Sequence, residues 1–165
     1  MNKIYKMFLY KTYFPDHSEN LMENEGNLES ARNIFYKNSF RNLDFLLAKR
    51  YTWMNDFLNK KKKIIEIGAG AGFSKFYLNH KIILTDAIKY QWIDEKVDAL
   101  KLPYKNNSLD VIIASHTIHH FFSPILFFKE CSRVLKKDGL IVIQEINTSL
   151  LCRFLLKLMK HEGYS

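Results

Sequence analysis

Apolar residues recur along this chain with two different spacings. From residue 28 to about 37, and again from 42 to about 58, they return every three or four positions, which predicts two helices. After residue 62, short apolar runs bounded by polar clusters are typical of strands. The expected strands cover residues 64–67, 81–86, 109–116 and 140–145, with helices over residues 74–78 and 124–137.

This alternation of strands with helical segments favours an α/β fold built on a mostly parallel sheet. At 165 residues, the chain is long enough for one domain with its own core and short for two. We therefore expect residues 1–60 to form an N-terminal helical segment of the same domain. Residues 61–165 would then form the core, with ligands bound at the carboxyl ends of its strands.

Three alternating glycines, Gly68, Gly70 and Gly72, follow the first predicted strand. Such a turn brings the backbone close to a ligand, and a following helix would offer it free N–H groups. A dinucleotide fingerprint is disfavoured because Phe73 occupies the place of its third glycine. A phosphate loop is also excluded, since no Lys-Ser or Lys-Thr pair follows a glycine at the required spacing.

An acidic residue, Asp86, ends the second predicted strand. A carboxylate at the carboxyl end of a parallel strand can accept hydrogen bonds from both hydroxyls of a ribose. The alternative is a strand-end aspartate that caps the next turn. The glycine turn upstream favours the ribose interpretation.

Four segments, in this order, resemble the type-11 group of class I S-adenosylmethionine-dependent methyltransferases. They are E-x-G-x-G-x-G at residues 66–72, the strand ending at Asp86, D-A-x-x-L-P at 98–103, which follows the third strand of the family, and a fourth strand at 109–116 with Asp110, followed by His119-His120. The resemblance covers residues 62–146. It implies a Rossmann-like, doubly wound sheet, S-adenosylmethionine as cofactor and no metal.

The resemblance also implies roles for individual residues. Asp86 would bind the ribose and Asp98 the adenine, while Glu66 would support the glycine turn and the amino group of the cofactor. Further cofactor contacts are expected from the glycine turn, from the residue after Asp98 and from the end of the fourth strand: Gly68, Ala69, Gly70, Gly72, Ala99, Ser115 and His116. Residues 1–60 would cover the cofactor or the substrate.

Two histidines, His119 and His120, are the candidate catalytic residues, because histidine accepts a proton near neutral pH. The alternative is a structural role at the start of a turn. We expect a small-molecule or glycan acceptor. The N-P-P-Y segment typical of methylation on exocyclic amines is replaced by Ser-His-Thr-Ile at 115–118, and no cysteine nucleophile lies there. A nucleic-acid methyltransferase and a non-catalytic cofactor-binding protein remain alternatives.

The net charge of +8 would ordinarily favour nucleic acid or an anionic membrane as a partner. A genome rich in A and T would give the same positive charge without any anionic partner, because Lys, Asn, Ile, Phe and Tyr all have A/T-rich codons and are abundant together in this chain. We favour this explanation. No apolar run approaches about 18 residues and no secretory leader is visible, so we expect a cytoplasmic protein without a transmembrane segment. Cys131 and Cys152 lack metal-ligand spacing.

The last part of the chain carries no strand pattern after residue 145, whereas the sheet of the family normally ends with two further strands. We therefore expect a fold that lacks its last two strands and a fifth strand, residues 140–145, whose exposed edge allows self-association. Turnover by this chain alone would then be weak. Residues 149–160 read as an amphipathic basic helix packed on the sheet.

Overall fold

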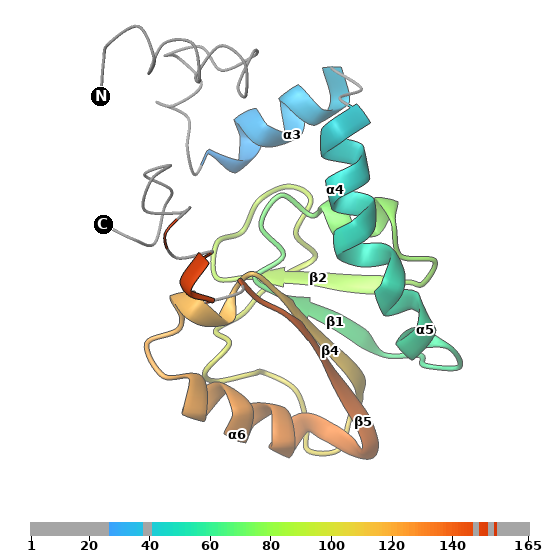
Figure 1. Cartoon of the computed structure of the whole chain (residues 1–165). Coiled ribbons are helices and arrows are strands. Elements are labelled where there is room, and N and C mark those ends of the chain that lie inside the picture. The colour runs from blue at the N-terminus through green and yellow to red at the C-terminus, as the bar shows by residue number, and fades with distance from the viewer. Residues whose placement is uncertain (1–26, 38–40, 147–148, 152–153, 155–165) are drawn as a thin grey trace, which may run out of the picture. The chain divides into compact units, whose positions relative to one another are not determined.

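The computed structural model describes residues 27–37, 41–146, 149–151 and 154 (Figure 1). The chain divides into two compact units between Phe40 and Arg41. Helix α3 (Leu28–Lys37) is the described element of the first unit. The second unit begins with α4 (Arg41–Tyr51), η1 (Thr52–Met54) and α5 (Asn55–Leu58). The helix predicted over residues 28–37 is confirmed, and the one predicted over residues 42–58 is present as two α-helices joined by the 3-10 turn η1.

Five parallel strands form the sheet in the order β3-β2-β1-β4-β5. The central strand β1 pairs on both sides, with Ile65 opposite Ile83 of β2 and Ile112 of β4. This arrangement confirms the Rossmann-like, doubly wound fold. The strands are β1 (Ile64–Ile67), β2 (Ile82–Asp86), β3 (Glu95–Lys96), β4 (Leu109–Ser115) and β5 (Leu135–Gln144).

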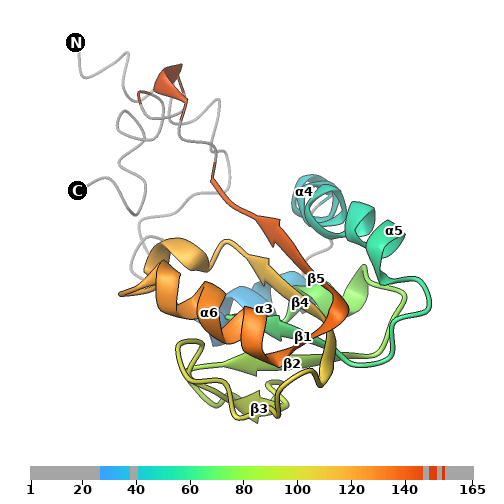
Figure 2. The ribbon, with the colours of Figure 1, turned by 90° about the horizontal axis from the view of Figure 1, so that it is seen from below.

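Helices cover both faces of this sheet, α6 (Pro124–Val134) on one side and α4 with α5 on the other (Figure 2). Successive strand side chains point to opposite faces, so β1 serves both layers. Ile65 and Ile67 join the apolar cluster that contains Phe127 of α6. Glu66 lies on the α4 side. The sheet is thus buried on both faces, and its carboxyl edge is where loops from several strands meet.

The helical segment expected over residues 74–78 is shorter than predicted and is not an α-helix. The connection from β1 to β2 contains only the 3-10 turn η2 (Phe73–Phe76), whose N-cap is Gly72. Contacts with α5 end the helical segment early. Asn55 Nδ2 donates to the carbonyl of Tyr77 at 3.0 Å, and the N–H of Asn79 donates to Asn55 Oδ1 at 2.9 Å. The backbone groups that would continue a helix are therefore bonded to another element.

The end of α6 also differs from the prediction. The helix stops at Val134 and β5 begins at Leu135, five residues earlier than expected. Leu135 pairs with Leu109 beside an irregularity in the ladder between β4 and β5. A Cβ at Gly139 would lie 2.9 Å from the Leu135 side chain, so this glycine serves close packing within the strand and not a helix stop.

Asp110, on β4, forms hydrogen bonds with β5 and with the segment that precedes β1. Its Oδ1 pairs with Lys136 Nζ at 2.8 Å, while Oδ2 accepts the N–H groups of Lys62 and Lys63 at 3.2 and 2.8 Å. The hydrogen bond to Lys136 is the largest effect on the pKa of Asp110, burial opposes it, and the two N–H groups lower the pKa further, to about 2. The carboxylate thus ties β4 to β5 and to the segment entering β1.

β5 lies at one edge of the sheet and, within the described residues, pairs only with β4. Leu140 and Ile143 on this strand are each 37% exposed. Self-association through this strand stays a prediction. The amphipathic helix expected over residues 149–160 falls largely outside the described residues. Within the described part of the chain, no helix combines the length and the apolar character needed to cross a membrane.

Candidate functional site

The glycine turn after β1 has the predicted left-handed conformation. Gly68, Gly70 and Gly72 have φ angles of +64°, +52° and +69°, a region that residues with a Cβ rarely adopt. The N–H of Ala69 donates to the carbonyl of Thr85 at 3.0 Å, and the N–H of Gly72 donates to the carbonyl of Ala69 at 2.8 Å. The turn is therefore closed on itself and anchored on β2.

Asp86 lies at the carboxyl end of β2, directly beside this turn. Its Oδ2 accepts the N–H of Gly70 at 2.9 Å and its Oδ1 accepts the N–H of Ile88 at 3.1 Å. A carboxylate offers about four acceptor positions, so two remain for a ligand. The two sequence interpretations of Asp86 are therefore compatible with each other. The carboxylate caps the local turns through two acceptor positions and keeps two more that could accept hydroxyl groups.

Trp92 holds the same glycine from the opposite side. Its indole Nε1–H donates to the carbonyl of Gly70 at 2.8 Å, and its ring stacks on Tyr90 with centroids 4.9 Å apart. Gly70 is thus fixed through its N–H by Asp86 and through its carbonyl by Trp92. Sequence reasoning missed Trp92, and no motif signal points to it.

Glu66 is buried beneath the turn, with 1% of its surface exposed. Its Oε2 accepts the hydroxyl of Ser74. Burial raises the pKa of Glu66 to about 7, against the opposing effects of the Ser74 hydrogen bond and the Arg50 charge. The carboxyl group therefore links β1 to η2 from below, and its contact with Ser74 was not foreseen.

Thr117 fills the space above Gly68. A Cβ on that glycine would lie 2.0 Å from Thr117 Oγ1, far inside van der Waals contact. Thr117 belongs to the loop after β4 and is 6% exposed. The close approach expected for a ligand at Gly68 is made here by this side chain, so Gly68 allows the loop after β4 to pack on the glycine turn.

The end of β4 lies over the same edge. Ser115 is 8% exposed, and within the described residues its Oγ has no hydrogen-bond partner of good geometry. His116 has φ +52°, and its N–H donates to the carbonyl of Gln144 at 2.8 Å. Burial lowers the pKa of His116, the Arg50 charge adds to this effect, and Glu145 opposes it. The imidazole is thus favoured in its neutral form.

Glu145, just past β5, organises the loop that carries the two histidines. Its Oε1 accepts the N–H groups of Thr117 and Ile118 at 2.9 and 2.7 Å, and its Oε2 lies 2.7 Å from His119 Nδ1. Burial alone would raise the pKa of Glu145, yet these three partners outweigh it and hold the pKa below its usual value. The loop forms the 3-10 turn η3 (Ile118–His120).

The two histidines of this turn differ in their surroundings. His119 is held by Glu145 through Nδ1, which leaves Nε2 available, while His120 lies with its ring centroid 4.1 Å from that of His119. Both are exposed. Sequence reasoning found the pair but missed the carboxylate that fixes one member, because Glu145 follows a strand that is distant in the sequence.

Asp98 and Ala99 lie just after β3, next to the end of β2. The backbone N–H of Val97 donates to the carbonyl of Asp86 at 2.9 Å, so these two segments run together. Asp98 Oδ1 accepts the N–H of Leu100 at 2.8 Å, and the Asp98 side chain is exposed. Ala99 packs partly against the core cluster. Among the described residues, no three His, Cys, Asp or Glu side chains are grouped as a metal site.

Comparisons with known proteins agree with this architecture. Residues 65–143 match a protein family described as a methyltransferase domain. None of the curated proteins compared with the chain matches it significantly. An S-adenosylmethionine-dependent methyltransferase from Thermotoga maritima is similar in structure, with 24% identity and a TM-score of 0.57 over 81% of this chain and 69% of that one.

The YcgJ protein of Bacillus subtilis is similar as well, with 21% identity and a TM-score of 0.53 over 66% of this chain. The matched region spans 56% of the length of that protein. At these identities the likeness concerns the fold. The family match, the topology and the glycine turn together imply S-adenosylmethionine as the cofactor.

Proposed function

We propose that this chain, whose residues 65–143 form a class I S-adenosylmethionine-dependent methyltransferase domain, transfers a methyl group to a small-molecule or glycan-type acceptor. The observation that carries the proposal is the joint placement of the glycine turn and Asp86. Gly70 and Asp86 lie 2.9 Å apart through an N–H···O bond, at adjacent strand ends where ligands of open parallel sheets bind.

The residues present suit the two ends of an adenosine. Asp86 keeps two acceptor positions for ribose hydroxyls, as its two N–H partners leave half of its capacity open. Asp98 has one carboxylate oxygen outside its turn, and it can accept from the exocyclic amine of an adenine. We propose these two contacts as the ribose and adenine contacts.

The protein's contribution to the reaction is mainly positioning. When bound, S-adenosylmethionine supplies a methyl carbon that leaves with the bonding pair staying on sulfur. Holding an acceptor in line with such a carbon can account for several kcal/mol, about 7 at the lower end of measured effective molarities. Gly70, fixed by Asp86 and Trp92, gives this chain a rigid turn against which a donor is held.

Where the acceptor must lose a proton, we propose His119 as the base. Glu145 fixes its Nδ1 at 2.7 Å, which orients the ring and leaves Nε2 to accept the proton. His120 is exposed beside it and has no such carboxylate partner within the described residues. His120 would then be a neighbour of the base and not the base itself.

The acceptor class rests on the segment after β4. Residues 115–118 read Ser-His-Thr-Ile, so the segment expected for methylation on an exocyclic amine of a base is replaced. Cys131 is buried in the α6 layer and cannot act as a nucleophile at this edge. These features favour small molecules and glycans over nucleic acid.

The test is formation of S-adenosylhomocysteine when the protein and S-adenosylmethionine are mixed with separate pools of small molecules, glycans and nucleic acids. The proposal expects turnover with one of the first two pools and a large loss in the Asp86→Asn variant. Turnover with the nucleic-acid pool alone would contradict the acceptor class. Tight cofactor binding with no turnover in any pool would instead support a non-catalytic binding protein.

A further inference from the structure

Large apolar side chains cover the outer side of α6 and the loop that leads into this helix. The inner side of α6 is committed to the core, since Phe127, Cys131 and Val134 are fully buried. A single exposed apolar residue is ordinary, whereas a group of them on one surface marks a binding site for a partner. The apolar group on α6 consists of Phe122, which is 97% exposed, and of the exposed residues Ile125, Leu126 and Phe128.

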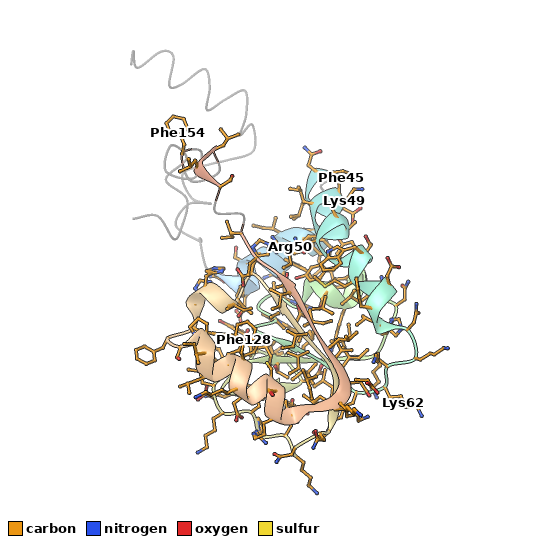
Figure 3. The ribbon with its side chains drawn as sticks, turned by 60° about the horizontal axis from the view of Figure 1, so that its bottom comes forward. Phe45, Lys49, Arg50, Lys62, Phe128 and Phe154 are labelled. Atoms are coloured by element: carbon orange, nitrogen blue, oxygen red, sulfur yellow. The ribbon has the colours of Figure 1, made fainter. Side chains whose placement is uncertain are left out.

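A second exposed apolar group follows β5. Leu150, Leu151 and Phe154 are helical, and each is between 64% and 82% exposed. The sequence favoured packing of this segment on the sheet, and these three side chains do not pack there. Figure 3 labels Phe128 of the group on α6 and Phe154 of the group after β5. Two surfaces of this chain are therefore apolar and uncovered.

The two groups start from one point of the fold. Glu145, just past β5, lies with its Oε2 2.7 Å from His119 Nδ1. Phe122 follows His119 by three residues, and Leu150 follows Glu145 by five. A fully extended chain spans at most about 3.6 Å per residue, so each group begins within about 20 Å of its anchoring residue. One broad surface laid against the carboxyl edge of the sheet can therefore reach both groups.

The charge beside these two groups is positive. Lys129, on the exposed side of α6, has no ion-pair partner within the described residues, whereas its neighbour Glu130 is paired with an arginine of the same helix at 2.7 Å. Residues 146–160 contain three cations and no acidic residue. Codon usage accounts for the number of cations in the chain but not for their position beside exposed apolar side chains.

We propose that the apolar group on α6 and the apolar group after β5 together bind the surface of an anionic lipid bilayer. The apolar side chains enter the headgroup region and the cations contact anionic lipid, as in amphipathic helices that lie in the membrane interface. The edge of the sheet that carries the glycine turn then lies beside the bilayer. This inference does not depend on which acceptor is methylated.

Other partners fit this surface less well. In a symmetric dimer the same patch is used by both copies, so the cations of one copy would face those of the other. A nucleic acid is bound chiefly through cations and stacked aromatic rings, and it would leave aliphatic side chains such as Ile125 and Leu150 without an apolar partner. An anionic bilayer offers both an apolar interior and a negative surface.

Sedimentation with two kinds of vesicle tests the proposal. One kind contains phosphatidylcholine alone and the other equal parts of phosphatidylcholine and phosphatidylglycerol, each at low and at high salt. The variants are Phe122→Ser, the double variant Leu150→Ser with Phe154→Ser, and the control Leu46→Ser. Leu46 is 63% exposed on α4, which covers the face of the sheet opposite α6 (Figure 2). Circular dichroism checks that each variant is folded.

We expect the parent to bind the anionic vesicles at least about tenfold more tightly than the neutral ones, with a marked loss at high salt. Phe122→Ser and the double variant should each weaken this binding by about tenfold or more, because each removes apolar surface that enters the bilayer. Leu46→Ser should bind like the parent.

A pair of lysine variants tests the charge. Lys129→Gln should weaken binding to the anionic vesicles by about fivefold and leave binding to the neutral ones unchanged. The control is Lys62→Gln, whose lysine is exposed just before β1, at the amino edge of the sheet (Figure 3). It should bind both kinds of vesicle like the parent.

No binding to the anionic vesicles, equal binding to both kinds, or an equal loss in Leu46→Ser would overturn the proposal. A loss in only one of the two apolar variants would also contradict it, because the proposal needs both groups. A dimer that Phe122→Ser dissociates, seen by sedimentation velocity without vesicles, would identify a second copy as the partner instead. S-adenosylhomocysteine affinity should be unchanged in every variant, and a parallel loss would attribute the effect to a damaged fold and count against the proposal.

Discussion

The backbone N–H of Gly70 donates to Asp86 Oδ2 at 2.9 Å, which joins the glycine turn after β1 to the carboxyl end of β2. The same glycine is held through its carbonyl by Trp92 at 2.8 Å. A flexible residue is thus fixed at both of its polar groups. The turn is therefore preorganised before any ligand arrives, which lowers the entropy cost of binding.

Gly68 should not tolerate a side chain, because Thr117 occupies the space above it. The Gly68→Ala variant would place its Cβ 2.0 Å from Thr117 Oγ1 at a left-handed φ of +64°. We expect a loss in the free energy of unfolding of about 3 kcal/mol or more, from overpacking and backbone strain together. Urea unfolding measures this loss.

Thr117→Ala supplies the matched test of the cause. Removing Oγ1 and Cγ2 relieves the worst overlap, so the double variant should be less destabilised than the sum of the two single variants. Strict additivity of the two losses would show that backbone strain alone, and not packing of the loop after β4, explains the glycine.

Glu66 should make the stability of the protein depend on pH near neutrality. Burial raises its pKa from 4.5 to about 7, so between these values the folded state holds a proton that the unfolded state has released. The free energy of unfolding therefore falls as pH rises through this window, by about 3 kcal/mol for a shift of this size. Glu66→Gln removes the titrating group and keeps an acceptor for Ser74.

The difference between parent and Glu66→Gln isolates this effect. His116, whose lowered pKa gives the opposite slope as it loses its proton, is present in both proteins. Thermal unfolding at pH 5 and at pH 8 should show a parent that loses more stability than the variant over this interval. Parallel losses would mean that Glu66 titrates normally.

Asp110→Asn should destabilise the sheet without affecting the ligand site. The aspartate lies at the amino end of β4, away from the glycine turn, and holds Lys136 together with the N–H groups of Lys62 and Lys63. Loss of charged hydrogen bonds predicts a decrease of about 1 to 3 kcal/mol in the free energy of unfolding. Its lowered pKa, about 2, means that this contribution is present at neutral pH and fades as pH falls below about 4.

Chemical denaturation at pH 7 and at pH 3 measures this contribution. The gap between parent and Asp110→Asn should narrow at the lower pH. Cofactor affinity of the folded variant is the control, and a large loss of affinity would show that Asp110 serves the site.

The two histidines should differ in their effect on turnover. His119→Gln removes the ring that Glu145 orients, and we expect it to lower methyl transfer by about 100-fold or more where the acceptor must lose a proton. His120→Gln should have little effect. A pH profile of kcat/KM separates a base from a structural residue, since only loss of the base removes the rise of kcat/KM with pH on the acidic side of the profile. A larger loss in His120→Gln than in His119→Gln would reverse the assignment.

The sequence was sufficient to predict the parallel sheet and its carboxyl edge, because apolar runs and the glycine turn are local signals. The sequence also indicated that Gly70 and Asp86 lie at the same edge of the sheet, because one follows β1 and the other ends β2, and these two strands are neighbours. The sequence predicted an α-helix after the turn where the structure has only a 3-10 turn, because the contacts of Asn55 with the backbone of Tyr77 and Asn79 join segments that no local signal connects. Gly139 was misread for a similar reason, since a strand glycine and a helix-stop glycine look alike in sequence.

Contacts between distant segments could not be predicted. Thr117 against Gly68, Trp92 on Gly70 and Glu145 on His119 all join residues whose separation carries no periodic signal.

The most direct measurement of the central claim is calorimetric titration of S-adenosylhomocysteine into the parent protein, Asp86→Asn and the control Asp138→Asn, each with a chelator present. Asp138 is exposed on β5, far along the sheet from the glycine turn. The account predicts metal-independent binding to the parent and the control, and a loss of at least about tenfold in Asp86→Asn, as charged hydrogen bonds to the ribose are removed. Parent-like affinity in Asp86→Asn would contradict it.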